Sequence, residues 1–150
     1  MEATRVPAGA VVLVGDGRKA LFLRNRGTAN DPRLETERVL KQENPATRDQ
    51  GADRPGRRTG GWSGHRTALD ETDWHELGED RFAATVAAAL HRSLLDGRLE
   101  QLIVIAPPSA LGVLRSKLTH EVAERVIAEI PKTLTGREVP AIQRLLTGVD

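Results

Sequence analysis

The sequence lacks cysteine and tyrosine and contains only two tryptophans and two phenylalanines in 150 residues. Without cysteine, disulfides, thiolate catalysis and cysteine-ligated zinc are excluded. The scarcity of aromatic rings argues against the base-stacking surfaces that bind single-stranded nucleic acid. No apolar run approaches the length of a membrane span, and the first residues lack the features of a secretory signal. These absences predict a cytoplasmic protein without membrane insertion.

Charge is unevenly distributed along the chain, although its net value is only +1. The segment RPGRRTGGWSGHR, residues 54–66, holds four arginines, four glycines and no acidic residue. It lies within residues 44–78, where we find neither helical nor strand periodicity. A connection of this length is either functional or disordered, and its composition predicts a flexible loop.

Residues before this loop predict three strands. Residues 10–15, AVVLVG, form a short valine-rich run typical of a buried strand. The dipeptide Asp16–Gly17 predicts a tight turn, so KALFLRNR, residues 19–26, should return as the second strand of a hairpin. Residues 34–42 fit a third strand better than a short helix, because their side chains partly alternate.

After the loop, helices alternate with strands. Phe82, Val86, Leu90 and Leu94 recur every four residues and predict a helix over 79–96. Further strands are expected at 102–106 and 125–130, and further helices after Pro107–Pro108 and over 137–146. The predicted fold is therefore a single α/β domain over residues 1–150, with a mixed five-stranded sheet in the order 3-2-1-4-5 and three main helices. This is the topology of ribonuclease H-like and release-factor middle-domain folds.

Several stretches resemble a known family in order and spacing: VGDGRKALFL, DRPGR, DRFAATVAAAL, LIVIAPPSALGVLR and EIPKTLT. Together they resemble the bacterial host attachment protein family, over roughly residues 10–147. That family is similar to bacterial relatives of the archaeo-eukaryotic peptide-chain release factors, specifically their middle domain. The chain departs from the family at Thr133, where an acidic residue is common, and this weakens any mechanism that needs a carboxylate there.

The release-factor resemblance raises the question of hydrolysis on peptidyl-tRNA. Release factors carry Gly-Gly-Gln in a loop at this place in the topology, whereas here Trp62 follows Gly60 and Gly61. An indole offers one N–H donor and no amide acceptor, so it cannot replace the glutamine. We therefore expect no catalytic residues. The loop is either a solvated linker or a binding segment whose arginines contact phosphates while Trp62 stacks on a base or enters a protein groove.

Other kinds of site find less support. A ribonuclease H-like nuclease needs several carboxylates, but only Asp16 ends a central strand, and it fits a turn residue better. His65 and His75 lack metal-ligand spacing, so neither a metal nor a cofactor is expected.

The segment PPSALG opens a helix after a buried strand, where backbone amides can hold an anion. Ser109 either supports such a site or caps the helix. The candidate binding residues are Arg54, Arg57, Arg58, Gly60, Gly61, Trp62, His65, Arg66, Ser109 and Arg115.

The sequence thus predicts a non-enzymatic protein of the host attachment family that interacts with the ribosome or RNA through its basic loop. Its effect on attachment would be indirect, because no export signal is visible. Two alternatives stay open: a surface-associated adhesion protein that binds a protein partner, and a release-factor-like peptidyl-tRNA hydrolase.

Overall fold

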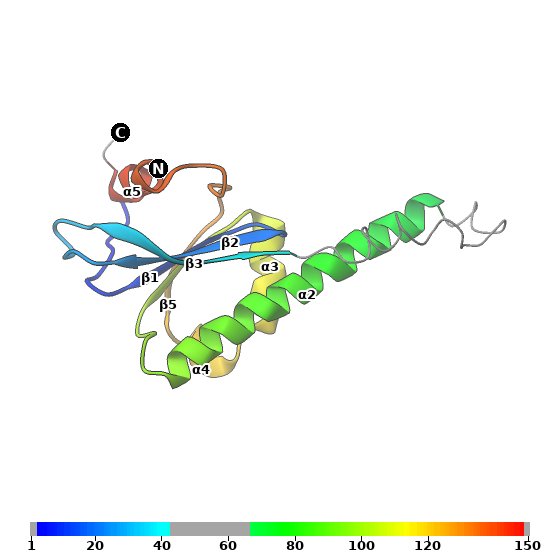
Figure 1. The fold of residues 1–150 in the computed structure, drawn as a ribbon, viewed down its shortest axis with the longest axis horizontal. Coiled ribbons are helices and arrows are strands. Elements are labelled where there is room, and N and C mark those ends of the chain that lie inside the picture. The colour runs from blue at the N-terminus through cyan, green and yellow to red at the C-terminus, as the bar shows by residue number, and fades with distance from the viewer. Residues whose placement is uncertain (1–2, 43–66, 149–150) are drawn as a thin grey trace.

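The computed structural model describes residues 3–42 and 67–148 as one sheet with helices on both faces. Helices α2, α3 and α4 lie on one side of the sheet, and α5 lies on the other, near both termini (Figure 1). The predicted α/β architecture is confirmed.

Five strands form the sheet in the predicted order β3-β2-β1-β4-β5. β1 pairs antiparallel with β2 and parallel with β4, so the meander and the crossover strands meet at β1. β4 is buried on both faces, as its unbroken apolar sequence predicted. The strands are β1 Val11–Gly15, β2 Lys19–Asn25, β3 Leu34–Lys41, β4 Leu102–Ile105 and β5 Val126–Ile130.

Four helices are present in the described residues, one more than the three main helices expected. They are α2 Thr67–Leu95, α3 Pro108–Lys117, α4 His120–Ala123 and α5 Val139–Thr147. The additional helix, α4, is a single turn that His120 opens and the Thr119 hydroxyl caps by accepting a hydrogen bond from the Val122 N–H. Within the described ranges, none of these helices is apolar enough over sufficient length to span a membrane.

The start of α2 corrects the sequence prediction. Residues 67–78 belong to this helix, whereas they were expected to end the loop at 44–78; the remainder of that loop, up to residue 66, lies outside the described residues. Apolar periodicity detects only a helical segment that packs against something, and Phe82, Val86 and Leu90 do so. The N-terminal half of α2 instead extends beyond the sheet, and its sequence has no apolar stripe (Figure 1).

Two acidic residues near the middle of α2, Glu79 and Asp80, make contacts outside the helix. Asp80 accepts a hydrogen bond from Lys117 Nζ at 2.9 Å and so links α2 to α3. Glu79 lies against the turn between β1 and β2, because a Cβ atom added at Gly17 would be 2.8 Å from its carboxylate. Their role is tertiary contact rather than compensation of the helix dipole.

The sheet divides the core into two apolar layers. Leu13, Phe22 and Val104 face α2 and α3, while Val12, Leu23 and Ile103 face α5. Successive residues of a strand point to opposite faces, which explains why adjacent residues enter different layers. α2 fills the first layer with Phe82, Val86 and Leu90, and α5 fills the second with Ile142 and Leu146.

Candidate functional site

Only two of the sequence-predicted binding residues belong to the described part of the chain. Ser109 and Arg115 both lie on α3. The loop residues Arg54, Arg57, Arg58, Gly60, Gly61, Trp62, His65 and Arg66 lie outside the described residues.

Ser109 is exposed in the first turn of α3 but does not cap it. The capping position is occupied by Pro107, and no side chain makes a cap hydrogen bond to this helix. The capping role expected for Ser109 is therefore wrong: Pro107 is already extended, so helical geometry begins at Pro108, before the serine.

Arg115 is engaged within the protein. Its guanidinium group donates two hydrogen bonds to the Glu129 carboxylate on β5. This interaction raises the pKa of Arg115 above its ordinary value. The geometry assigns Arg115 to a contact between α3 and the edge strand, and does not bring it together with Ser109 into one site.

Asn25 organises the loop that joins β2 to β3. Its buried side-chain Nδ2 donates to the carbonyls of Val6, Pro7 and Thr28 at 3.0–3.2 Å. Its Oδ1 accepts from the N–H groups of Gly27 and Arg33 at 2.8 and 2.9 Å. One amide thus satisfies five backbone groups and holds the ends of this loop in place.

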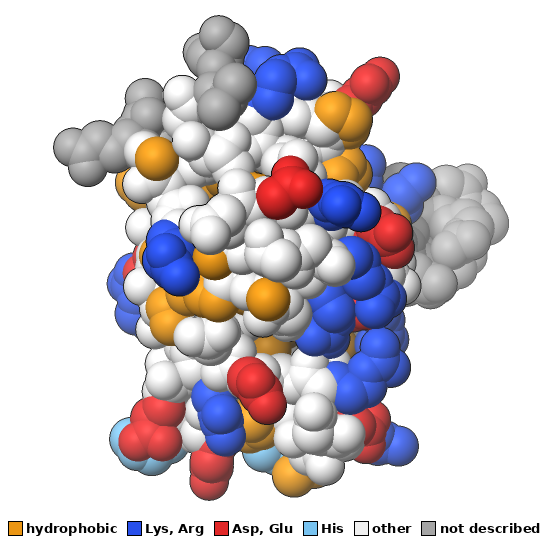
Figure 2. Space-filling view, turned by 90° about the vertical axis from the view of Figure 1, so that its left-hand side faces the viewer, with side chains coloured by type: hydrophobic (Ala, Val, Ile, Leu, Met, Phe, Trp, Pro, Cys, Tyr) orange, Lys and Arg blue, Asp and Glu red, His pale blue; other side chains and the backbone are white. Residues whose placement is uncertain are grey.

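Beside that loop, Arg24, Arg26 and Arg98 converge on Glu37, and we call these three residues the arginine cluster. Their guanidinium nitrogens lie 2.7, 3.0 and 3.5 Å from the same oxygen, Oε2 of Glu37. Arg26 also approaches Glu35 at 3.4 Å. Figure 2 views this end of the molecule and shows Lys and Arg side chains gathered on its surface.

Members of the arginine cluster differ in exposure and in function. Arg24 is 15% exposed and also donates to the carbonyls of Gly9 and Arg98, so it is a structural residue. Arg26 and Arg98 are 51% and 63% exposed. Three cations share two carboxylates here, which leaves exposed guanidinium N–H donors and excess positive charge available to an anion.

Glu37 holds the cluster together and is itself 18% exposed. Partial burial raises the pKa of Glu37, but the hydrogen bond from Arg24 and the charges of the cluster outweigh that effect and hold the pKa below its usual value. The carboxylate is therefore ionised at neutral pH.

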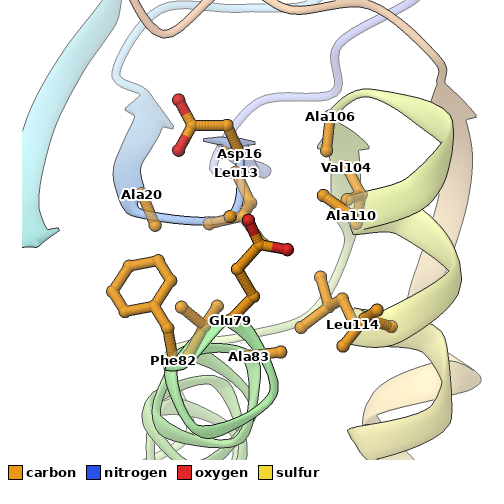
Figure 3. A pocket seen from close by; sticks show the side chains of 14 residues that line it. Leu13, Asp16, Ala20, Glu79, Phe82, Ala83, Val104, Ala106, Ala110 and Leu114 are labelled. Atoms are coloured by element: carbon orange, nitrogen blue, oxygen red, sulfur yellow. The ribbon is translucent and has the colours of Figure 1, made fainter. Parts of the chain in front are cut away.

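A pocket lies at the other end of β1, between the sheet, α2 and α3 (Figure 3). Its empty volume is about 440 Å³, a value that includes space open to solvent. Its floor is apolar, with Leu13, Phe82 and Leu114 among its lining residues, and Asp16 and Glu79 are its charged members. The carboxyl ends of the parallel strands β1 and β4 border it, which is where α/β sheets commonly bind ligands.

Asp16 has the predicted turn role and one further contact. Its Oδ1 accepts from the N–H groups of Arg18 and Lys19 at 2.7 and 2.8 Å, and its Oδ2 accepts from the Thr135 hydroxyl at 2.6 Å. Partial burial raises the pKa of Asp16, but these hydrogen bonds outweigh it and lower the pKa overall. Within the described chain, no three carboxylate or imidazole groups are placed to share a metal ion.

Both the arginine cluster and the pocket escaped sequence reasoning. Arg24, Asn25 and Arg26 follow one another at the end of a predicted strand, which is a visible signal for the cluster. Arg98 and Glu37 are 61 residues apart, so only the strand order could have brought them together. The pocket combines Asp16 and Glu79, which are distant in the sequence and are brought together only when α2 packs on the sheet.

The observed strand order agrees with the order that the sequence predicted. The family model of bacterial archaeo-eukaryotic release factor family 12 matches residues 9–146. The chain therefore belongs to this family. The match supports the release-factor part of the expected resemblance, while the host attachment part stays a prediction. No curated protein matches the chain.

Proposed function

We propose that this family member is a non-enzymatic RNA-binding module that acts on the ribosome in the cytoplasm. The arginine cluster carries the proposal. Arg26 and Arg98 present exposed guanidinium groups beside a loop whose position Asn25 maintains. Guanidinium groups in such an arrangement suit phosphate oxygens, which they bind with two parallel hydrogen bonds.

The basic segment 54–66 supplies a second source of phosphate contacts. Its four arginines have no acidic neighbour within the segment, and their charge adds to that of the cluster. Together, the two regions would bind RNA through its phosphate backbone. Such binding does not depend on the base sequence. Any part in attachment to host cells would follow indirectly from this activity.

Binding of a fluorescein-labelled ribosomal RNA hairpin, followed by anisotropy over a range of salt concentrations, tests the proposal. Arg26→Gln with Arg98→Gln removes two phosphate contacts while retaining polar side chains. We expect weaker binding and a log–log salt slope shallower by about 1.5 units. Arg137→Gln, an exposed arginine preceding α5, is the matched control and should have the smaller effect.

Three results would overturn parts of the proposal. No binding by the unaltered protein would refute RNA recognition altogether. An unchanged slope in the double variant would exclude the cluster; the change of Arg54, Arg57, Arg58 and Arg66 to serine would then show whether the segment alone binds, since up to about 3–4 units of slope would be lost. Release of the peptide from peptidyl-tRNA would refute the non-enzymatic assignment and favour the hydrolase alternative.

A further inference from the structure

We propose that the pocket between β1, β4, α2 and α3 binds a small organic amine with an apolar body. This site is separate from the arginine cluster, because it lies at the opposite end of β1. The inference is independent of RNA binding, and neither result decides the other.

Shape and polarity define the ligand class. The pocket opens to solvent at its mouth, and its lower part is lined by Leu13, Phe82, Ala83 and Leu114, an apolar lining with few polar groups that is common in small-molecule sites. These side chains offer apolar contact and no hydrogen bonds to a ligand. The body of the ligand is therefore apolar, and any polar group it carries lies toward the mouth.

Charge at the mouth selects a cation. The side chain of Glu79 extends from α2 toward the end of β1, where the Asp16 carboxylate lies (Figure 3). Among the described residues that line the pocket none is basic, while Lys19, outside the lining, offsets part of the negative charge of Asp16. An ammonium group has three N–H donors and one positive charge, so it would match this pair of acceptors, whereas a carboxylate or phosphate would be repelled.

The two carboxylates differ in how firmly their side chains are held in place. Asp16 is oriented by the Thr135 hydroxyl and by the turn N–H groups, so its position is determined before any ligand enters. The flexible end of Glu79 lies against Gly17, where a Cβ atom would be 2.8 Å from the Glu79 Cδ and Oε2. We assign Glu79 as the main contact of the ammonium group and Asp16 as a fixed charge beside it.

Amide NMR titration with 2-phenylethylamine tests this assignment, with 2-phenylethanol as the neutral probe of the same shape. We expect saturable shifts at Gly15, Gly17, Ala83 and Ala110, and binding of the amine at least about fivefold tighter than the alcohol. Glu79→Gln should abolish most of that difference, while Glu121→Gln, an exposed change on α4, should leave it intact. Ala110→Leu should weaken both probes by filling the pocket, and its remaining amide spectrum reports whether the fold is retained.

Other outcomes would overturn the proposal. Equal binding of amine and alcohol would show that the carboxylates select nothing. Shifts outside the pocket, or no saturable shift with the unaltered protein, would show that no amine site exists here. If the amine kept its advantage in Glu79→Gln, the assignment of Glu79 would be refuted.

Discussion

The two ends of β1 carry opposite chemistry. At its start, where Val11 is paired with Arg24, three arginines share Glu37 and Glu35. At its end, beyond Gly15, Asp16 and Glu79 border an apolar pocket. Both ends thus contain carboxylates, but their neighbours give them different functions. The Glu37 carboxylate pairs with three arginines, two of which are exposed to solvent. The Asp16 carboxylate is oriented by hydrogen bonds beside the pocket.

The difference indicates which ligand each end can accept. A surface with excess guanidinium groups suits an extended polyanion, because many weak phosphate contacts add together. A small pocket with a charged mouth suits one compact molecule. These differences underlie the two proposals, RNA as the ligand of the arginine cluster and a small amine as the ligand of the pocket.

Asn25→Ala should have the largest effect on the hairpin end. The change removes one buried amide and its hydrogen bonds to five backbone groups, of which the Pro7 carbonyl keeps a second partner in the Ala10 N–H. We expect a loss of about 3 kcal/mol in the free energy of unfolding, measured by urea denaturation. Asn30→Ala, an exposed change in the same loop, should cost less than about 0.5 kcal/mol. Equal effects of the two changes would contradict the anchoring role of Asn25.

Glu37→Gln should have the next largest effect, and should act in two directions. Removal of the shared carboxylate leaves the three arginines to repel one another, so we expect a loss of about 2 kcal/mol in stability. The same change frees positive charge, so RNA affinity should rise. Denaturation and anisotropy on the same variant measure both. A variant that loses RNA affinity while it remains folded would show that Glu37 does not compete with phosphate.

Acid should destabilise both ends. The folded-state pKa values of Glu37 and Asp16 are depressed from ordinary values of 4.5 and 3.8. Their contribution is therefore fully present above those ordinary values, and is lost as pH falls through the lower folded values. Thermal unfolding between neutral pH and pH 3 should show a declining midpoint, and Glu37→Gln should flatten part of the decline. A decline of the same size in the variant would mean that other carboxylates cause it.

Thr135→Val should have the smallest effect, confined to the pocket end. It removes the hydrogen bond to Asp16 at nearly constant side-chain volume. We expect a loss of about 1 kcal/mol at pH 7 that diminishes in acid, where Asp16 is protonated in both states. Thr133→Val, an exposed change two residues earlier, is the control. A loss for Thr135→Val that did not vary with pH would arise from packing and not from Asp16.

Much of the fold could be predicted because the central strands β1, β2 and β4 contain apolar runs and a turn dipeptide follows β1. Some features can be recognised from neighbouring residues alone. These are the valines of β1, the Asp16–Gly17 turn and the unbroken apolar sequence of β4. The start of α2 could not be predicted, because Thr67 to Gly78 lacks the apolar stripe by which a packed helix is identified. A helix that extends beyond its own sheet leaves little periodicity to detect.

The candidate site was harder to predict than the fold for a different reason. Asn25, Arg98 and Thr135 act through partners that are distant in the sequence, such as Thr135 and Asp16, which are separated by 119 residues. Periodicity contains no information about such pairs. Local reasoning did identify the turn role of Asp16, because two of its hydrogen bonds are made within three residues.

Co-sedimentation with ribosomes through a sucrose gradient tests the central claim most directly. A lysate containing the unaltered protein is compared with lysates containing the Arg26→Gln, Arg98→Gln double variant or Arg137→Gln, each at low and at raised salt. We predict that the unaltered protein and Arg137→Gln migrate with ribosomes at low salt, that raised salt releases them, and that the double variant is released at lower salt. Absence of the unaltered protein from the ribosomal fractions, together with its recovery at the cell surface, would contradict the account and favour an adhesion-associated protein.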